Sequence, residues 1–418
     1  MIVVRGGRSL SGRVRAAGAK NAALPAIFAS LLTPEPVELS GVPRLRDVET
    51  AVELVEALGK EVLWEGGRVV IREVGPLSPR APEGLVRRMR ASFLVLGPLV
   101  ARLGEAQVPL PGGCAIGTRP VDLHLKGLSA LGAELTVRGG WVHARAPRLQ
   151  GRTVYLDYPS VGATEQLLLA GALADRETVV LNPAREPEVV DLSRLLSAMG
   201  AETRWEEDRV TVKGRRELSG ASWEVIPDRI EAGTFLLAGA ITHGKVRTEG
   251  VIPEHLGALL IKLGEAGVEV ELGGDWVEVA ATEGFCGVNL ETRPYPGFPT
   301  DLQPPMVSLL SLAKGESLVT ETVFEGRFGH VGELLRMGAS IRRQGASLLI
   351  RGVEGLTGTR TLASDIRAGA ALVLAGLAAQ GTTYVEGTEH IHRGYENLTE
   401  KLRELGAWIW EEGRESSR

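Results

Sequence analysis

The chain has 418 residues, of which 44% are hydrophobic and 24% charged, values typical of soluble globular proteins with two or more domains. Its formal net charge of −5 excludes an overall basic field that would attract nucleic acid or an anionic membrane, so any anion site has to be local. The only cysteines, Cys114 and Cys286, lie far apart and exclude a disulfide framework. Cys286 is interpreted as a buried or incidental thiol.

The N-terminus, Met-Ile-Val-Val-Arg, reaches an arginine at once and lacks the apolar core of a signal peptide. The longest apolar runs, such as residues 370–379, are too short to span a membrane. We therefore expect a cytoplasmic protein with neither nucleic acid nor a membrane as its partner.

A repeat of about 70 residues runs through the whole chain. In each copy, a Leu-Gly or Met-Gly pair follows an amphipathic segment, and a glycine at that point suits the C′ position of a helix. The glycines are Gly59, Gly132, Gly200, Gly267, Gly338 and Gly406. Alternating hairpins follow them, as in residues 133–143 and 268–278.

A second element, an apolar helix rich in Ala, Gly and Leu, recurs in the same rhythm. These helices have little polar face, so we expect them to be buried on all sides. They span residues 21–32, 91–103, 163–174, 231–242, 302–313 and 367–379. Because six such units cannot share one small core, we expect two groups of three, each with three sheets around its buried helices.

Counting units places the boundary between the two halves near Pro227-Asp228. We expect an N-terminal domain of residues 20–227 and a C-terminal domain of residues 1–19 and 228–418. The first strand, residues 2–5, precedes the first unit and would complete the last one. The chain would then cross twice between the domains, with a cleft between them.

Polar residues gather at the N-terminal ends of the apolar helices, where unpaired N–H groups and the helix dipole favour anions. Ser160, Asp301 and Asp365 are ordinary N-caps when taken singly. Lys20, Arg90 and Arg367 carry the wrong charge for a helix start unless an anion binds there. These ends therefore predict an anion site.

Residues 111–120 (PGGCAIGTRP) form a glycine-rich loop that contains Cys114 and Arg119. A nearby cation favours the thiolate, and a mobile loop could carry the sulfur onto a substrate. A plain glycine turn with an incidental cysteine is the alternative. His390 and His392 have the spacing of a metal pair, but no third His or Cys is close in sequence, so we expect no metal.

Taken together, these motifs resemble those of the UDP-N-acetylglucosamine enolpyruvyltransferases, in the EPSP synthase superfamily. The matching segments cover essentially the whole chain in order, at residues 18–25, 88–92, 111–122, 227–231, 298–301, 321–328 and 392–396. The resemblance implies an α/β (α+β) fold of two inverse α/β barrel-like domains. Each would have three repeated units, with the active site in the interdomain cleft.

The resemblance also implies a reaction. The enolpyruvyl group of phosphoenolpyruvate would pass to the 3′-hydroxyl of UDP-N-acetylglucosamine by addition and elimination, with release of phosphate and no cofactor or metal. This is the first committed step of peptidoglycan synthesis. Cys114 matches the proposed proton donor and the site that fosfomycin alkylates, and Asp301 matches the carboxylate that accepts the hydroxyl proton.

The positions that match binding residues form two sets. Phosphoenolpyruvate is expected to contact Lys20, Asn21, Arg119, Arg327, Arg367 and Arg393, of which Lys20 and Arg393 are also expected to be catalytic. UDP-N-acetylglucosamine is expected to contact Asn21, Arg90, Arg119, Pro120, Val121, Asp122, Leu123, Ser160, Val161, Gly162, Asp301 and Val323. Tyr158-Pro159 depart from the family, which has a lysine and a small residue there, so Tyr158 either stacks on the uracil or merely covers it.

Two alternatives remain. The sister transferase that acts on shikimate 3-phosphate shares the six-unit fold, but it lacks the Pro-Gly-Gly-Cys loop. A catalytically silent nucleotide-sugar binder is the other alternative, and the intact Cys114, Asp301, Lys20 and Arg393 argue against it.

Overall fold

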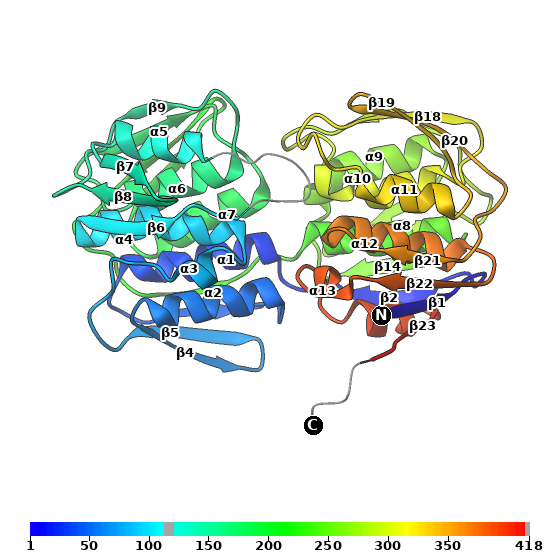
Figure 1. Cartoon of the computed structure of the whole chain (residues 1–418), viewed down its shortest axis with the longest axis horizontal. Helices are drawn as coiled ribbons and strands as arrows, with labels where there is room; N and C mark the ends of the chain where they lie inside the picture. Colours follow the sequence, from blue (N-terminus) through cyan, green and yellow to red (C-terminus); the bar gives the residue numbers. More distant parts are fainter. Residues whose placement is uncertain (113–120, 414–418) are drawn as a thin grey trace. The chain divides into compact units, whose positions relative to one another are not determined.

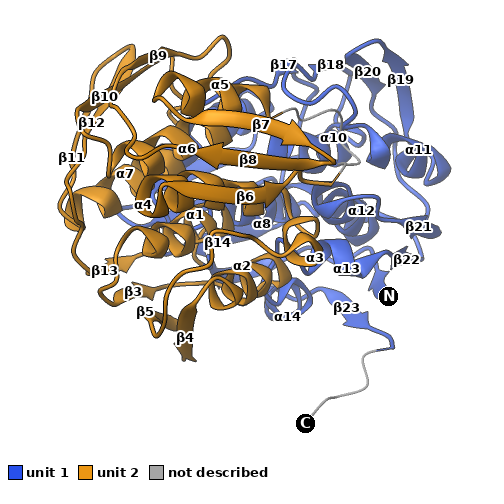
Figure 2. Cartoon of the chain, turned by 60° about the vertical axis from the view of Figure 1, so that its left-hand side comes forward, with its two compact units in different colours: residues 1–17, 114–118, 227–418 blue, residues 18–113, 119–226 orange. Residues whose placement is uncertain are grey.

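The computed structural model describes residues 1–112 and 121–413, which form two compact units. Unit 1 contains residues 1–17 and 227–413, and unit 2 contains residues 18–112 and 121–226 (Figure 2). Of the predicted site residues, Cys114, Arg119 and Pro120 lie outside the described part of the chain. None of the described helices is long and apolar enough to cross a membrane.

Unit 2, which runs from blue to green in Figure 1, has three described sheets, with strand orders β13-β3-β5-β4, β6-β8-β7 and β11-β12-β10-β9. Its strands are β3 (Val37–Ser40), β4 (Lys60–Glu65), β5 (Arg68–Glu73), β6 (Glu105–Pro109), β7 (Glu134–Arg138), β8 (Trp141–Arg145), β9 (Thr153–Tyr155), β10 (Glu177–Leu181), β11 (Glu202–Trp205), β12 (Arg209–Lys213) and β13 (Ala221–Glu224). Its helices are α1 (Lys20–Ala29), η1 (Ser30–Leu32), α2 (Arg46–Ala57), α3 (Glu83–Val86), η2 (Arg90–Val95), α4 (Leu96–Leu103), α5 (Asp122–Ala130), α6 (Val161–Gly171) and α7 (Pro187–Ala198).

Unit 1 likewise has three described sheets, with orders β21-β22-β1-β23, β15-β16-β14-β2 and β17-β18-β20-β19. Its strands are β1 (Ile2–Arg5), β2 (Ser11–Arg15), β14 (Lys245–Glu249), β15 (Glu269–Leu272), β16 (Trp276–Ala280), β17 (Leu290–Glu291), β18 (Glu316–Thr320), β19 (Ser340–Gln344), β20 (Ser347–Arg351), β21 (Arg360–Leu362), β22 (Thr382–Glu386) and β23 (Trp408–Glu411). Its helices are α8 (Arg229–Ile241), η3 (Pro253–Leu256), α9 (Gly257–Glu265), η4 (Thr300–Leu302), α10 (Gln303–Leu310), α11 (Gly329–Arg336), α12 (Ile366–Ala378), α13 (Thr388–Ile391) and α14 (Leu398–Glu404).

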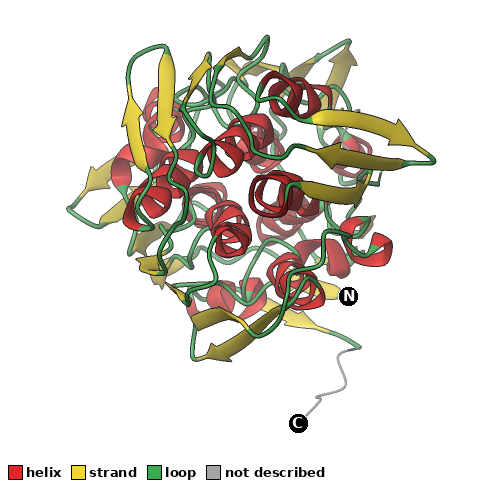
Figure 3. Cartoon of the chain, turned by 90° about the vertical axis from the view of Figure 1, so that its left-hand side faces the viewer, coloured by secondary structure: helices red, strands yellow, loops and turns green. Residues whose placement is uncertain are grey.

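The six predicted apolar helices are confirmed, and they form the interior of the two compact units. They are α1 with η1, η2 with α4, α6, α8, α10 and α12, and strands lie outside the helices in Figure 3. In α8, every residue from Ile230 to Ile241 is buried, because the helix has no polar face to turn to solvent. A Cβ on Gly233 would lie 2.7 Å from Leu302 Cδ1, so a side chain here would force the helices apart.

The repeated glycines are confirmed at the ends of the amphipathic helices. All six have positive φ angles, between 86° and 114°, as a C′ residue in the left-handed region requires. The hairpins predicted after two of them are β7–β8 and β15–β16, both antiparallel.

Two edge strands are exchanged between the units. In a regular copy, β9 leads through α6 to β10 and pairs with it in parallel. By contrast, β2 leads to α1 in unit 2 but pairs in parallel with β14 of unit 1. Conversely, β13 leads to α8 in unit 1 but pairs in parallel with β3 of unit 2. The N-terminal strand β1 lies between β22 and β23 and is antiparallel to both.

The units divide at residues 17/18 and 226/227, whereas the repeat spacing predicts divisions at 19/20 and 227/228. Backbone hydrogen bonds account for the difference. The Asp228 N–H donates to the Ala17 carbonyl (2.8 Å) within unit 1, and the Ala19 N–H donates to the Ile226 carbonyl (2.7 Å) within unit 2.

Candidate active site

In unit 1, the N-terminal ends of α8 and α12 are capped by aspartates. Asp228 accepts hydrogen bonds from the backbone N–H groups of Ile230 (2.8 Å) and Glu231 (3.0 Å). Asp365 accepts from those of Arg367 (2.9 Å) and Ala368 (3.0 Å). Both carboxylates satisfy N–H groups that the helices leave unpaired. Because α8, α10 and α12 pack against one another, their polar starts are brought together.

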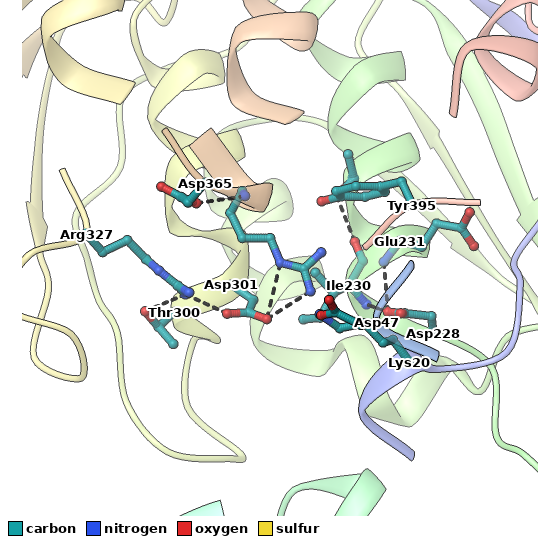
Figure 4. A network of polar contacts seen from close by, with 12 residues as sticks. Lys20, Asp47, Asp228, Ile230, Glu231, Thr300, Asp301, Arg327, Asp365 and Tyr395 are labelled. Atoms are coloured by element: carbon teal, nitrogen blue, oxygen red, sulfur yellow. Dashed lines mark hydrogen bonds and ion pairs between the residues drawn. The ribbon is translucent and has the colours of Figure 1, made fainter. Parts of the chain in front are cut away.

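Asp301, in the short helix η4, lies between two guanidinium groups (Figure 4). Arg327 Nη1 donates to Asp301 Oδ1 at 2.5 Å. Arg367 donates to Oδ2 through both Nε (3.2 Å) and Nη2 (3.0 Å). Both arginines are buried, and the carboxylate therefore binds two cations in a site that excludes most water.

The Arg367 guanidinium keeps its charge despite its burial. Burial lowers its pKa, but Asp301, Tyr395 and Asp228 act in the opposite direction and raise it above the ordinary value. The guanidinium lies 5.2 Å from the centre of the Tyr395 ring. The Tyr395 hydroxyl is in turn 3.0 Å from Thr234 Oγ1, which fixes the ring that supports the arginine.

Arg327 is held by three further contacts. Its Nη1 donates to Thr300 Oγ1 (3.1 Å), and its guanidinium lies 4.8 Å from the Phe324 ring centre. Its backbone carbonyl accepts from Gln303 Nε2 at 3.2 Å. These contacts fix the orientation in which Arg327 meets Asp301.

In unit 2, Lys20 is the first residue of α1, and its side chain is buried. A cation is disfavoured at a helix N-terminus, and here Asp47, in the first turn of α2, accepts from Lys20 Nζ at 3.1 Å. Asn21, the next residue, is half-buried, and Arg90 begins η2 and is also half-buried.

Two predicted nucleotide-sugar segments of unit 2 lie side by side. A Cβ on Gly162 would come within 3.0 Å of the His124 ring, so the start of α5 packs against the start of α6. Ser160 caps α6, and its side chain accepts from the Ala163 N–H at 3.3 Å. Asp122 is exposed at the start of α5, between buried Val121 and half-buried Leu123. Val161 is half-buried in the first turn of α6.

The remaining predicted residues lie on loops. Val323 follows β18, and its backbone N–H donates to Glu321 Oε1 at 2.8 Å. Arg393 follows α13 and is half-buried. Tyr158, at the departure from the family pattern, is 41% exposed.

Cys286 corrects an expectation, because its side chain is exposed. The neighbouring Phe285 is buried instead. Adjacent residues of an extended segment point to opposite sides, and Cys286 forms an isolated parallel bridge with Lys314. Among the described residues, no group of three His, Cys, Asp or Glu could hold a metal ion.

Sequence reasoning missed several residues that support the site. Asp47 lies in the first turn of α2, where acidic residues are common. Nothing in the local sequence therefore indicated that it pairs with Lys20. Tyr395 and Glu321 belong to the matching segments, yet their partners lie at distant positions along the chain.

Unit 2 also contains buried carboxyl groups near the start of α7. Burial, followed by the nearby charges of Glu188 and Glu186, raises the pKa of Glu165 well above its ordinary value. Burial also raises the pKa of Asp191 to about 6, although Trp223 Nε1 donates to its Oδ1 at 3.2 Å and acts in the opposite direction.

The sequence profile of EPSP synthase (3-phosphoshikimate 1-carboxyvinyltransferase) matches residues 4–402. UDP-N-acetylglucosamine 1-carboxyvinyltransferase 2 of Carboxydothermus hydrogenoformans is 52% identical over 410 residues, covering 97% of this chain and 98% of that protein. The UDP-N-acetylglucosamine 1-carboxyvinyltransferase of Acidiphilium cryptum is 51% identical over 417 residues, covering 98% of each.

Solved structures agree in fold. The crystal structure of the enolpyruvyl transferase NikO from Streptomyces tendae has a TM-score of 0.88 and 28% identity, with 98% of each chain covered. The EPSP synthase of Acinetobacter baumannii has a TM-score of 0.75 and 20% identity, with 98% of this chain and 99% of that chain covered, a likeness of fold alone.

Proposed function

Because this chain belongs to the EPSP synthase family, we propose that it transfers the enolpyruvyl group of phosphoenolpyruvate to the 3′-hydroxyl of UDP-N-acetylglucosamine and releases phosphate. With this activity the protein is an enzyme of peptidoglycan synthesis, and it acts in the cytoplasm. The proposal rests on the similarity to UDP-N-acetylglucosamine 1-carboxyvinyltransferases. The aligned regions cover nearly the whole chain, and about half of the aligned residues are identical.

The reaction consists of an addition and an elimination. In the addition, the 3′-oxygen forms a bond to C2 of phosphoenolpyruvate, and C3 gains a proton. In the elimination, C3 loses a proton and the bond from C2 to the phosphate oxygen breaks. Asp301 accepts the proton of the sugar hydroxyl, and Cys114, outside the described residues, delivers a proton to C3.

Phosphoenolpyruvate carries a phosphate and a carboxylate, so its site needs several cations. We assign this role to Lys20, Asn21, Arg119, Arg327, Arg367 and Arg393. Two buried donors support the assignment, because Arg327 Nε and Arg367 Nη1 have no hydrogen-bond partner among the described residues. A buried N–H donor without a partner is costly, and a bound anion would satisfy both.

UDP-N-acetylglucosamine is assigned to the adjacent segments 121–123 and 160–162 of unit 2, with Asn21, Arg90, Arg119, Pro120, Asp301 and Val323. The half-buried state of several of these residues supports a role in contacting a ligand from the surface. Tyr158, with an exposed ring, stacks on the uracil in this proposal. Fosfomycin inhibits the reaction by alkylating Cys114.

Phosphate release tests the proposal. The purified chain is mixed with phosphoenolpyruvate and either UDP-N-acetylglucosamine or shikimate 3-phosphate, and phosphate is measured over time. We expect turnover with the nucleotide sugar alone. Turnover with shikimate 3-phosphate alone would assign the chain to the sister activity, and nucleotide-sugar binding without phosphate release would indicate a silent binder.

Two substitutions at Cys114 test the proton donor. Cys114→Ala removes the proton donor, so turnover should become very slow; an undiminished rate across the pH range would exclude the role. Cys114→Asp retains a group that donates a proton, so we expect activity that fosfomycin no longer inhibits. Labelling of that variant by the drug would contradict the assignment.

A further inference from the structure

Glu321, the first residue after β18, is a buried carboxylate that accepts four hydrogen bonds. The residue is only 2% exposed, and its carboxylate forms no ion pair with a cation among the described residues. Oε1 accepts from Thr292 Oγ1 (2.8 Å), Val323 N (2.8 Å) and Phe324 N (2.9 Å), and Oε2 accepts from Thr300 Oγ1 (2.9 Å). Burial of a carboxylate is costly unless it is fully hydrogen-bonded, and these four donors meet that requirement.

One of these hydrogen bonds leads to the proton acceptor. The Thr300 hydroxyl donates to Glu321 and accepts from Arg327 Nη1 at 3.1 Å. The same nitrogen of Arg327 donates to Asp301 Oδ1 at 2.5 Å. Thr300 is also the residue before Asp301 in η4. Glu321 therefore fixes the hydroxyl that holds Arg327 against Asp301.

The other three hydrogen bonds lead to the loop of residues 322–324. Thr292 Oγ1 donates to Glu321 and accepts from the Thr322 N–H at 2.9 Å. The Thr322 hydroxyl donates in return to the Thr292 carbonyl. With the N–H groups of Val323 and Phe324 also bound to Glu321, the loop is held at three consecutive residues.

We propose that Glu321 is a positioning residue that fixes the proton acceptor Asp301 relative to the loop carrying Val323, the proposed nucleotide-sugar contact. The inference rests on the proposed function. In the reaction, the sugar must present its 3′-hydroxyl to Asp301, so the distance between the loop and the carboxylate decides whether a bound sugar reacts. The buried Glu321 carboxylate sets that distance, because it is hydrogen-bonded both to Thr300, beside Asp301, and to the loop.

The chemistry of an amide makes Glu321→Gln a selective test. With its carbonyl oxygen in the place of Oε1, glutamine still accepts from Thr292, Val323 and Phe324, so the loop is kept. Its NH₂ group then faces Thr300 Oγ1, which can no longer donate in that direction. The substitution therefore disturbs the contact to the Asp301 turn and leaves the contacts to the loop.

The experiment measures kcat, KM and the pH profile of turnover, with UDP-N-acetylglucosamine affinity measured separately by calorimetry. We expect Glu321→Gln and Thr300→Val to lower kcat by roughly ten-fold, with the affinity changed less than about two-fold, since one positioning hydrogen bond is lost. Thr300→Ser keeps the hydroxyl and should restore kcat. Thr292→Val should instead weaken nucleotide-sugar binding by roughly five-fold, and Thr292→Ser should restore it.

Glu316→Gln is the matched control. Glu316 begins the same strand, β18, and is exposed, with its carboxylate bound to Arg351 at 2.6 Å. We expect this variant to keep wild-type kcat, affinity and pH profile. If Glu321→Gln does not fold, the Thr300 and Thr292 pairs carry the test.

The outcomes separate the inference from the proposed function. Wild-type protein without phosphate release would refute the proposed function, whereas the binding measured for the two Thr292 variants would still test the loop contact. If the wild type turns over and Glu321→Gln and Thr300→Val match Glu316→Gln in kcat and affinity, the inference is wrong. A lower melting temperature with unchanged kcat and affinity would show a structural role alone and would also overturn it.

Discussion

Asp301 in unit 1 and Glu165 in unit 2 are carboxylates with opposite surroundings. The Asp301 side chain is 22% exposed and contacts two guanidinium groups. Glu165, only 5% exposed, has no ion pair among the described residues, and its charged neighbours include Glu188 and Glu186. Burial and those two like charges raise the pKa of Glu165 well above its ordinary value. Nearby cations favour the charged form of a carboxyl group, whereas burial beside like charges favours its neutral form.

The largest effect expected from this comparison comes from removing the charge at Asp301. Asp301→Asn keeps the shape but loses the proposed proton acceptor, so kcat should fall by about 10³-fold. Nucleotide-sugar affinity, measured by calorimetry, should change much less. A weakened affinity with normal kcat would mean that Asp301 only orients the sugar. The difference in surroundings between Asp301 and Glu165 would then have no bearing on catalysis.

The next effect concerns the cations that distinguish Asp301. Arg367→Lys keeps a positive charge but loses the two-nitrogen contact to Oδ2, so kcat/KM for phosphoenolpyruvate should fall by about 10²-fold. Steady-state kinetics with varied phosphoenolpyruvate measures this. Arg336→Lys is the control, because Arg336 is exposed and, within the part of the chain that the structure describes, pairs only with Glu333 on its own helix. Equal kinetics for the two variants would show that charge alone is sufficient at Arg367.

A smaller effect, on stability, is expected at Glu165. Because its pKa in the fold is raised above the ordinary 4.5, its stabilising contribution is complete below that pH and is lost as pH rises through the folded value. Glu165→Gln cannot ionise, so the variant should gain stability relative to wild type between pH 5 and pH 8. Urea unfolding at both pH values measures the difference. A stability difference independent of pH would show that Glu165 is not a buried acid of this kind.

The smallest effect concerns the helix that contains Glu165. Ser160→Ala removes the N-cap of α6 and should lower the free energy of unfolding by about 1 kcal/mol. If Ser160 also contacts the nucleotide sugar, KM for that substrate rises as well. Ser160→Asn keeps a capping side chain and separates the two roles: restored stability with a raised KM would indicate a binding contact.

The sequence predicted the helices of this fold well because their signals are local. Apolar composition identifies α8 or α12, and a C′ glycine marks the end of an amphipathic helix such as α2 or α11, without knowledge of any neighbour. The exchange of β2 and β13 was not predicted, because strand pairing depends on how the chain folds back, and the residues of an edge strand do not identify their partner.

The residues proposed for the candidate site could be named from the sequence, but their contacts could not. Asp301 and Arg367 were named separately, and their ion pair joins positions 66 residues apart. Lys20 was named as well, but its partner Asp47, 27 residues away on another helix, was not. Such pairs depend on helix packing in three dimensions. Whether a side chain is buried also depends on packing, and this is why the sequence alone left open whether Cys286 is a buried or an incidental thiol; the structure excludes the buried alternative.

The place of β1 between β22 and β23 has a consequence for synthesis on the ribosome. Arg5 pairs with Thr382, so β1 has to wait for a partner made about 380 residues later, on the order of 20 to 80 seconds at usual rates of translation. All of unit 2 is synthesised within that interval and can fold first. Meanwhile the nascent chain exposes the apolar segment Ile2 to Val4 to other chains and to chaperones, so this segment is open to wrong pairing until the final sheet assembles.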